Sequence, residues 1–350
     1  MKKYSLKNTE IYFLIPNLHA GGGEKVTLQI INYLLNRDFN VIVCSNSSVH
    51  INAKKKFRFE KILWERKIET TLKLYKILNN SSSDSIIIPV LTGPIILVGI
   101  LNIFLKRKVY AYEHSDLVDL YLNTTYIKKI WRYSLLKFAF FGISKFFVVN
   151  KYLKNKFSKN LNFSISNIYV ARNPFSKFLK FLKKNQITYN YKEKYSAYII
   201  GRYSPEKRIK EAIYYANKSL AVDEIIVITD KKEELMKDVG ELQKLKIYRS
   251  YREIKNFNLK RSFLLNFSQV DSFSLVIAEW LASKLPVLSV PSNNLRKIWS
   301  DYDCIFIDEL VTLSTKKLSA LIFNKKMSNK KILKEIDVRT TISDLFIDEN

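Results

Sequence analysis

The 350 residues are more than one compact core usually organises, so the length favours two domains in a single chain. Hydrophobic residues make up 47% and charged residues 26%, with 8 Gly and 7 Pro, which excludes wholesale disorder and collagen-like or low-complexity sequence. The 2 cysteines, Cys44 and Cys304, are too few and too far apart for a disulfide framework, which favours a reducing compartment. With only 3 His beside them, they do not supply the ligands of a structural zinc site.

Positive charge is concentrated in the first half of the chain. Residues 1–180 hold 29 basic and 10 acidic residues, a balance of +19, whereas residues 181–350 hold 30 and 22, a balance of +8. Such a field attracts nucleic acid, an anionic membrane surface, or an anionic substrate such as a lipid-linked phosphate. A lysine-rich, solubilising surface explains many of the same residues, so charge alone leaves these alternatives open.

Short β-branched runs alternate with longer helical patterns in the first half of the chain, which is typical of a parallel sheet covered by helices. The expected strands are 11–15, 41–44, 85–91, 109–112 and 146–149, and the expected helices are 24–37, 95–105 and 125–144. The sequence therefore predicts a first Rossmann-like domain over residues 1–176.

The mostly apolar residues 86–105 reach about the ~20 residues that span a bilayer. Pro and Gly interrupt them, so we favour a buried strand, a turn at 92–94 and a packed helix over a transmembrane helix. The first ten residues are polar and the apolar run after them is short, so no secretory signal is visible and we expect a cytoplasmic chain.

The strand and helix pattern restarts after a polar, lysine-rich linker at 177–194. The expected strands are 197–200, 224–228, 264–266 and 287–290, and the expected helices are 207–218, 232–239 and 275–283. This indicates a second Rossmann-like domain over 195–330, with residues 331–350 forming a tail helix that packs back toward the first domain. Two such α/β domains facing across a cleft place ligands at the carboxyl ends of both sheets.

Three strand-to-helix turns carry the polar residues of interest. Gly22 and Gly23 follow the first strand, where glycine lets the backbone approach a ligand and a helix start favours negative charge. The spacing is not G-x-G-x-x-G, so it does not indicate NAD. A tight structural turn explains these glycines equally well.

The other two turns lie in the second half. Arg202 and Lys207 occupy the turn after strand 197–200, where a guanidinium and an ammonium can hold a diphosphate from two sides. Asp271 precedes the helix that starts at 275 and Glu279 lies inside it, where a buried carboxylate needs partners such as a ribose diol. The backbone amides of this helix start, which belong to Phe273, Ser274 and Leu275, offer a further anion site.

The order of these pieces resembles glycosyltransferase family 4 of the GT-B fold. The match runs from the first strand to about residue 290, and each piece alone is weak. The motifs that carry the resemblance are Gly22-Gly23-Glu24, His114, Asn173-Pro174, Gly201-Arg202 with Lys207, and Asp271 with Glu279 before Leu285-Pro286-Val287. The resemblance implies a retaining transfer of sugar from a nucleotide-diphosphate donor, with no metal ion or other cofactor.

The resemblance also assigns roles to residues. Arg202 and Lys207 are expected to neutralise the departing diphosphate, Glu279 to hold the donor ribose, and Asp271, where the family usually has a glutamate, to contact the transferred sugar. His114 is expected beside the sugar and the acceptor, because its position at a strand end and the motif order favour that role over a structural loop histidine. The first domain then takes the acceptor side and the second binds the nucleotide sugar.

The acceptor side offers only one physical hint. Residues 126–147 combine five basic residues with aromatic ones, as an interfacial helix does. We favour a domain helix whose aromatics belong to the core, because the residues after Lys137 are apolar all round. An anionic membrane surface stays an alternative partner.

The function that these observations predict is hexosyl transfer to a glycan or lipid-linked acceptor in bacterial-type surface polysaccharide, lipopolysaccharide or oligosaccharide biosynthesis. We expect the protein to lie in the cytoplasm, with peripheral binding to the inner face of the cell membrane as an alternative. A non-catalytic basic module on the same scaffold, binding nucleic acid or a membrane surface, is the rival. No nucleic-acid reader motif is visible, so nucleic acid is not an expected partner.

Overall fold

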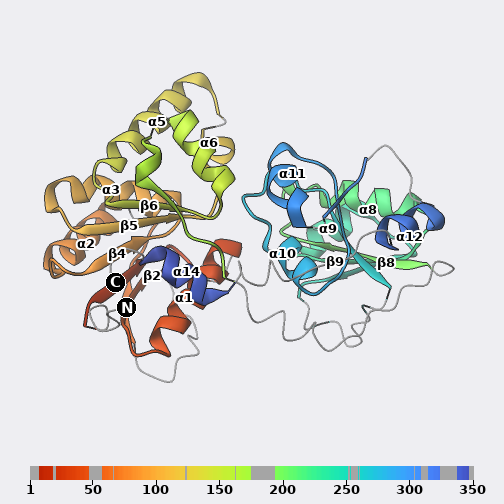
Figure 1. Ribbon diagram of the computed structural model, residues 1–350, viewed down its shortest axis with the longest axis horizontal. Helices are drawn as coiled ribbons and strands as arrows, with labels where there is room; N and C mark the ends of the chain where they lie inside the picture. Colours follow the sequence, from red (N-terminus) through yellow and green to blue (C-terminus); the bar gives the residue numbers. More distant parts are fainter. Residues whose placement is uncertain are drawn as a thin grey trace. The chain divides into compact units, whose positions relative to one another are not determined.

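The computed structural model describes residues 8–18, 21–46, 57–65, 67–122, 124–161, 163–174, 194–250, 253, 259, 261–302, 304–308, 314–323 and 337–346. Contacts within the chain divide it into two units (Figure 1). Unit 1 comprises Met1–Phe175 and Glu335–Asn350, and unit 2 comprises Ser176–Lys334. Residues 177–193 of the predicted linker lie outside the described residues.

Unit 1 is built on a parallel sheet of seven strands in the order β3-β2-β1-β4-β5-β6-β7. The strands are β1 Glu10–Leu14, β2 Asn40–Ser45, β3 Arg58–Lys61, β4 Ile86–Pro89, β5 Lys108–Glu113, β6 Lys145–Val148 and β7 Ile168–Val170. The central residues of β1, β2, β4, β5 and β6 are apolar and almost fully buried, as expected for parallel strands covered on both faces, whereas the edge strands β3 and β7 are only partly buried.

The helices of unit 1 cover both faces of its sheet. They are α1 Gly22–Leu35, α2 Lys67–Asn80, α3 Thr92–Leu105, α4 Leu117–Leu120, α5 Tyr126–Phe140, α6 Lys151–Leu161 and α14 Val338–Leu345, with a 3-10 turn, η1, at Ile165–Asn167. Helices α2, α3 and α5 pack in sequence on one face, and α14 lies beside α1 (Figure 1). The C-terminal helix thus belongs to unit 1.

Unit 2 repeats the plan with six parallel strands in the order β10-β9-β8-β11-β12-β13. The strands are β8 Tyr195–Ile200, β9 Val222–Ile228, β10 Leu245–Tyr248, β11 Ser262–Asn266, β12 Val287–Ser289 and β13 Ile305–Phe306. The helical segments are η2 Pro205–Lys207, α8 Ile209–Lys218, α9 Lys232–Val239, α10 Leu275–Ala282, α11 Asn293–Trp299, η4 Ser300–Tyr302 and α12 Thr315–Phe323. The predicted fold class, two Rossmann-like α/β domains, is confirmed.

The strand order reverses once in each sheet. The reversal lies between β1 and β4 in unit 1 and between β8 and β11 in unit 2. At such a switch point the loops after the two central strands diverge, which leaves room for a ligand at their carboxyl ends. The candidate residues of both units lie in these loops or next to them.

Two local predictions need correction. The helix predicted from residue 207 begins at Ile209, because Lys207 ends the η2 turn and Arg208 adopts a left-handed φ of 49°. The aromatics of 126–147 were expected in the core, but Trp131, Phe138 and Phe141 are exposed, and of the helix itself only Leu136 and Ala139 are buried. Residues 86–105 form β4 and α3, and among the described residues no helix has the length and apolar character to cross a bilayer.

Candidate functional site

His114 lies just after β5, at the carboxyl edge of the sheet of unit 1. Its Nδ1 is 3.1 Å from Oδ1 of Asn173, and that oxygen also accepts a hydrogen bond of 3.1 Å from the Tyr112 hydroxyl. The Tyr112 and His114 rings are 4.1 Å apart, centre to centre. Because an amide oxygen only accepts, Nδ1 carries the proton and Nε2 is the basic nitrogen of the neutral ring.

Burial fixes the charge state of this histidine. The His114 side chain is 6% exposed. Burial lowers the pKa of His114 to about 4, although the hydrogen bond with Asn173 opposes that change. The imidazole is therefore neutral at pH 7, which suits hydrogen bonding to a sugar hydroxyl better than binding an anion.

The predicted glycine turn contacts this histidine directly. Gly22 and Gly23 form the first turn of α1, so the helix begins two residues before its predicted start. A Cβ on Gly23 would lie 3.1 Å from both Cβ and Cγ of His114, which is tighter than nine in ten real Cβ contacts. Glycine at 23 therefore lets the start of α1 approach the His114 ring.

Glu113 was not singled out from the sequence, yet it organises the same edge. It is fully buried, and burial raises the pKa of its carboxyl. It accepts hydrogen bonds from the Thr92 hydroxyl at 2.9 Å and from the Ser115 amide at 2.9 Å. The adjacent Leu91 has a φ of 73°, the kind of backbone strain that often occurs at functional sites. Only the strand order places Thr92 beside Glu113, so no local sequence signal could reveal this contact.

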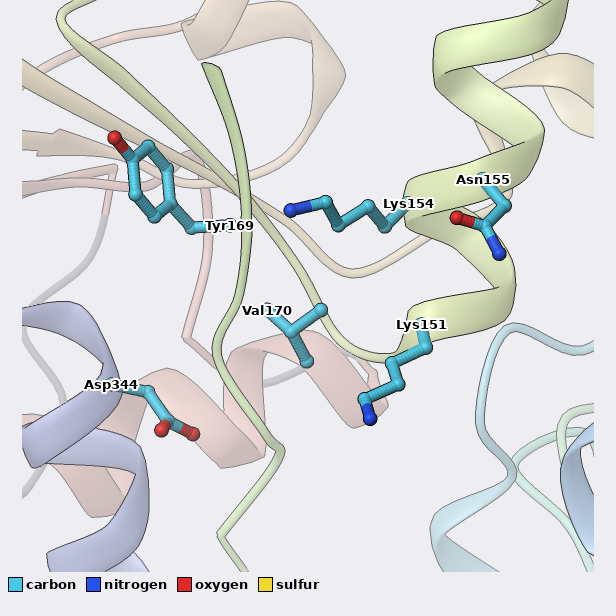
Figure 2. A pocket seen from close by; sticks show the side chains of 6 residues that line it. All are labelled: Lys151, Lys154, Asn155, Tyr169, Val170 and Asp344. Atoms are coloured by element: carbon cyan, nitrogen blue, oxygen red, sulfur yellow. The ribbon is translucent and has the colours of Figure 1, made fainter. Parts of the chain in front are cut away.

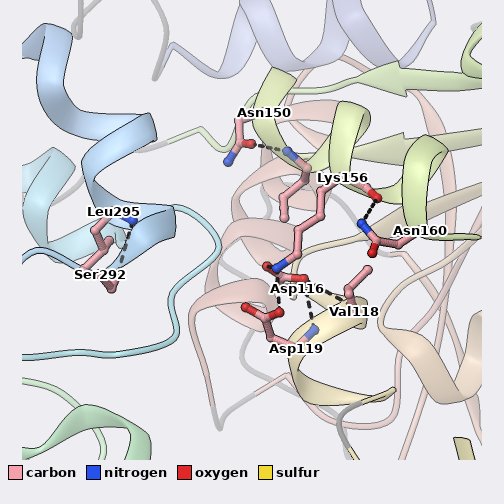
Figure 3. A network of polar contacts seen from close by, with 9 residues as sticks. Asp116, Val118, Asp119, Asn150, Lys156, Asn160, Ser292 and Leu295 are labelled. Carbon is pink, nitrogen blue, oxygen red and sulfur yellow. Dashed lines mark hydrogen bonds and ion pairs between the residues drawn. The ribbon is translucent and has the colours of Figure 1, made fainter.

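A partly buried ion-pair network lies close to His114 in the chain. Asp116, which is 1% exposed, accepts hydrogen bonds from the amides of Val118 and Asp119 at the start of α4. The Lys156 ammonium of α6 is 2.6 Å from a carboxylate oxygen of each aspartate (Figure 3). The two aspartates thus connect α4 to α6, and the network stabilises the loop that holds His114.

A pocket of about 380 Å³ opens elsewhere in unit 1. Its lining residues are Lys151, Lys154, Asn155, Tyr169, Val170 and Asp344. The two lysines reach from α6 toward β7, and Asp344 comes from α14 (Figure 2). Asp344 already pairs with Arg172 at 3.3 Å, so the pocket carries a surplus of positive charge.

Lys207 and Asp271 form the centre of the candidate site in unit 2. The Lys207 ammonium donates to Oδ2 of Asp271 at 2.8 Å and to the Ser268 hydroxyl at 3.2 Å. Lys207 follows β8, and Ser268 and Asp271 follow β11, so the pair joins the two strands of the switch point. An ammonium has three hydrogens, and since the described residues engage two of them, the third remains for a ligand.

The charge of Asp271 follows from its neighbours. Burial disfavours the carboxylate, but the Lys207 ammonium and the hydrogen bonds from Ser274 outweigh burial and lower the pKa of Asp271. Asp271 is thus ionised at pH 7 and balances Lys207. It also accepts a 2.8 Å hydrogen bond from the Ser274 amide.

That hydrogen bond corrects one expectation about the start of α10. The amides of Phe273, Ser274 and Leu275 were expected to bind an anion together, but the Ser274 amide is engaged by Asp271. Ser274 is the N-cap residue of α10 and has a left-handed φ of 53°. Asp271 holds the turn before the helix by accepting from the amide of this residue, a role that its position could have suggested.

The other two predicted residues of unit 2 differ in burial. Glu279 is 8% exposed, inside the apolar helix α10. Arg202 is exposed. Burial alone would raise the pKa of Glu206, but hydrogen bonds from Ser204 and from the Glu206 amide, with the charges of Lys207 and Arg202, lower it. The structure thus brings Lys207, Asp271 and Ser274 together in one unit, and His114 and Gly23 together in the other. Among the described residues, no group of three or more His, Cys, Asp or Glu is arranged to hold a metal ion.

Comparisons with known proteins bear on the fold. A scan against protein-family models gives no match, and a search of curated proteins also gives none. The chain is similar in structure to Anabaena Alr3699/HepE in complex with UDP-glucose, at 13% identity and a TM-score of 0.67, over 96% of this chain and 98% of that one. It is also similar to the lipopolysaccharide outer core galactosyltransferase WaaB, at 13% identity and a TM-score of 0.64, over 97% and 99% of the two chains.

The same fold serves a second kind of protein. UDP-GlcNAc 2-epimerase from Methanocaldococcus jannaschii superimposes with a TM-score of 0.57 at 16% identity, over 95% of this chain and 99% of that one. At identities this low, the likeness establishes the two-domain fold that these proteins share. The reaction has to be argued from the site.

Proposed function

We propose that this protein is a glycosyltransferase that moves a hexose from a nucleotide-diphosphate sugar to a glycan or lipid-linked acceptor. The observation that carries the proposal is the Lys207–Asp271 pair at the switch point of unit 2, where the part of the chain that the structure describes leaves one ammonium hydrogen for a ligand. The fold shared with HepE, whose structure holds UDP-glucose, supports a nucleotide-sugar donor. The motif order supports family 4, with retention of anomeric configuration.

This reaction requires that the negative charge on the leaving diphosphate be stabilised. The bond between the anomeric carbon and a diphosphate oxygen breaks, a bond to an acceptor oxygen forms, and the acceptor's proton leaves with the departing group or to solvent. Negative charge grows on the diphosphate as it departs, and a fixed cation stabilises that charge. Lys207 supplies the cation and Arg202 a second one, so we propose that transfer needs no metal ion. Glu279 holds the donor ribose.

Unit 1 takes the acceptor side in this proposal. His114, neutral and beside Gly23, hydrogen-bonds a sugar hydroxyl through Nε2. The products are surface polysaccharide, lipopolysaccharide or lipid-linked oligosaccharide, made at the inner face of the cytoplasmic membrane.

Turnover assays with single substitutions test the proposal. Release of nucleoside diphosphate is measured with a panel of UDP-, GDP- and ADP-sugars, with and without chelator, and the anomeric configuration of the product is read by NMR. Lys207→Ala should lower kcat/KM about 100-fold or more, because the leaving group loses its fixed cation. Glu279→Gln should mainly raise the KM for the donor.

Lys210→Ala is the matched control. Lys210 is an exposed lysine three residues away that pairs with Asp238, so its loss should leave turnover unchanged. Folded protein that turns over no donor would contradict the enzyme proposal and favour a binding module. Conversion of the donor into an epimer without acceptor would also contradict transfer, and equal rates for Lys207→Ala and Lys210→Ala would show that the site is misplaced.

A further inference from the structure

Exposed apolar side chains gather on one helical layer of unit 1. The described residues include 14 large hydrophobic side chains that are exposed, and 10 of them belong to the α2, α3 and α5 segments. These ten are Ile68, Leu72, Tyr75, Phe104, Tyr126, Ile127, Ile130, Trp131, Phe138 and Phe141. Single exposed apolar residues are ordinary on protein surfaces, but a contiguous group indicates a surface that binds something.

Helix α5 contributes most of this group and presents it in a line. Ile127, Trp131, Phe138 and Phe141 are 82%, 66%, 49% and 83% exposed. At ~100° per residue their positions fall within an arc of about 80°, so they form one stripe along the helix. Every residue from Tyr126 to Trp131 is exposed, so the first half of α5 stands clear of its own domain.

The flanks of the stripe are positively charged. Lys128 and Lys137 lie to either side of it, whereas Lys129 lies on the opposite side of the helix. Within the described part of the chain, none of these three lysines forms an ion pair. From Leu120 to Lys192 the sequence has 15 Lys or Arg and no Asp or Glu over 73 residues. Helix α5 therefore has no acidic side chain that could neutralise these lysines.

This charge decides between the occupants of the surface. A second copy of the chain would bring an equally basic surface against the first, and like charges across an interface oppose association. An anionic bilayer offers phosphates to the lysines and an acyl layer to the apolar stripe, which is how interfacial helices bind.

We propose that the α5 stripe, Ile127, Trp131, Phe138 and Phe141 with its flanking lysines, docks on a membrane surface rich in anionic phospholipids. The four apolar side chains enter the boundary between headgroups and acyl chains, and the ammonium groups of Lys128 and Lys137 contact lipid phosphates. This surface goes beyond the proposed sugar transfer and does not depend on it.

Vesicle binding by the full chain tests this inference without donor or acceptor. The protein should co-float with phosphatidylcholine vesicles that contain phosphatidylglycerol and remain largely in solution with phosphatidylcholine alone. Ile127→Ser with Trp131→Ser should lower the partition coefficient at least tenfold, and Lys128→Ser with Lys137→Ser should do so roughly tenfold as well. Quenching of Trp131 fluorescence by brominated acyl chains should report insertion, and Trp131→Phe should remove it.

The control is a pair of equally exposed apolar residues in the other unit. Leu220 and Met236 are 76% and 50% exposed, and Leu220→Ser with Met236→Ser should leave partitioning unchanged. Loss of binding in this control equal to that of the stripe variant would overturn the proposal. So would wild-type protein that ignores anionic vesicles, or a dimer in solution that the stripe substitutions dissociate. Because no turnover is measured, these results leave the glycosyltransferase proposal to its own test.

Discussion

The Lys207–Asp271 ion pair positions the lysine for a ligand and leaves both side chains accessible to solvent. The pair is partly exposed, with 21% of the Lys207 side chain and 13% of the Asp271 side chain open to solvent. Asp271 holds the Lys207 ammonium at the loop after β11, so the cation is already positioned before a diphosphate binds. Such preorganisation is what makes a fixed cation effective in catalysis, because little reorganisation is needed when charge develops.

The buried, neutral His114 should make the stability of the protein depend on pH. Its pKa in the folded protein is about 4, below the ordinary 6.5, so between these values the unfolded chain binds a proton that the folded one does not. The free energy of unfolding should therefore fall as pH drops from ~6.5 to ~4, by at most about 3 kcal/mol from this group. His114→Gln keeps a partner for Asn173 and should show a flatter dependence in denaturant unfolding.

An NMR titration gives the direct measurement. One imidazole resonance should titrate near pH 4 in the wild type and be missing from His114→Gln. A titration of His114 near 6.5, or identical pH dependences of unfolding for the two proteins, would contradict the buried, neutral state.

Motif order predicted which loops would carry these polar residues, but not which partners they would contact. Lys207 and Asp271 were both expected after strands, and they meet because β8 and β11 are neighbours in the sheet. The bonds of His114 to Asn173 and of Glu113 to Thr92 join strand ends far apart in the chain. The turn of Ser274 depends on a backbone angle that sequence patterns do not encode.

At the scale of elements, two glycines let α3 and α5 pack backbone against backbone. A Cβ on Gly99 would overlap the carbonyl oxygen of Ala139, and one on Gly142 would overlap that of Gly99. Asn102 secures the same contact, since its amide donates to the carbonyl oxygens of Gly142 at 2.7 Å and Arg107 at 2.9 Å. The contact fixes the C-terminal half of α5 and leaves its exposed half projecting.

Gly142→Ala should therefore destabilise unit 1. The new methyl group meets backbone on both sides, which cannot move aside as a flexible side chain can, so we expect a loss of about 1–3 kcal/mol or more. Gly93→Ala, in the first turn of α3 with open space around it, should be neutral or slightly stabilising. Thermal and denaturant unfolding of the two variants measure the difference, and equal stabilities would argue against a close contact at Gly142.

Periodicity predicts that a helix forms better than it predicts which side of the helix packs. The helix predicted at 232–239 is α9, with the same bounds. For α5, the apolar residues after Lys137 suggested a buried helix, but the glycine contact seats only one side of it and leaves Phe138 and Phe141 in solvent. Short strands such as β3, β10 and β13 were not predicted, because their pattern is too brief to separate from loops.

At the scale of the whole molecule, the chain builds unit 1, then unit 2, and returns to finish unit 1. Alternation of strands and helices was enough to predict two Rossmann-like domains, since few other folds bury such a pattern. The strand orders and the switch points required the structure. The returning helix α14 covers the same face as α1 and ties to the end of β7 through Arg172, which pairs with Asp344 at 3.3 Å.

This return predicts that the C-terminal helix stabilises unit 1 specifically. Leu345 is fully buried, and Leu345→Ala should cost about 2–5 kcal/mol through the cavity it leaves. Hydrogen exchange should then speed up in α1, which α14 contacts, and stay unchanged in α10 of unit 2. Ser343→Ala, at an exposed position of the same helix, should change neither. An equal rise in α1 and α10 would mean that the two units unfold together, and no rise in α1 would mean that α14 adds little to the core it covers.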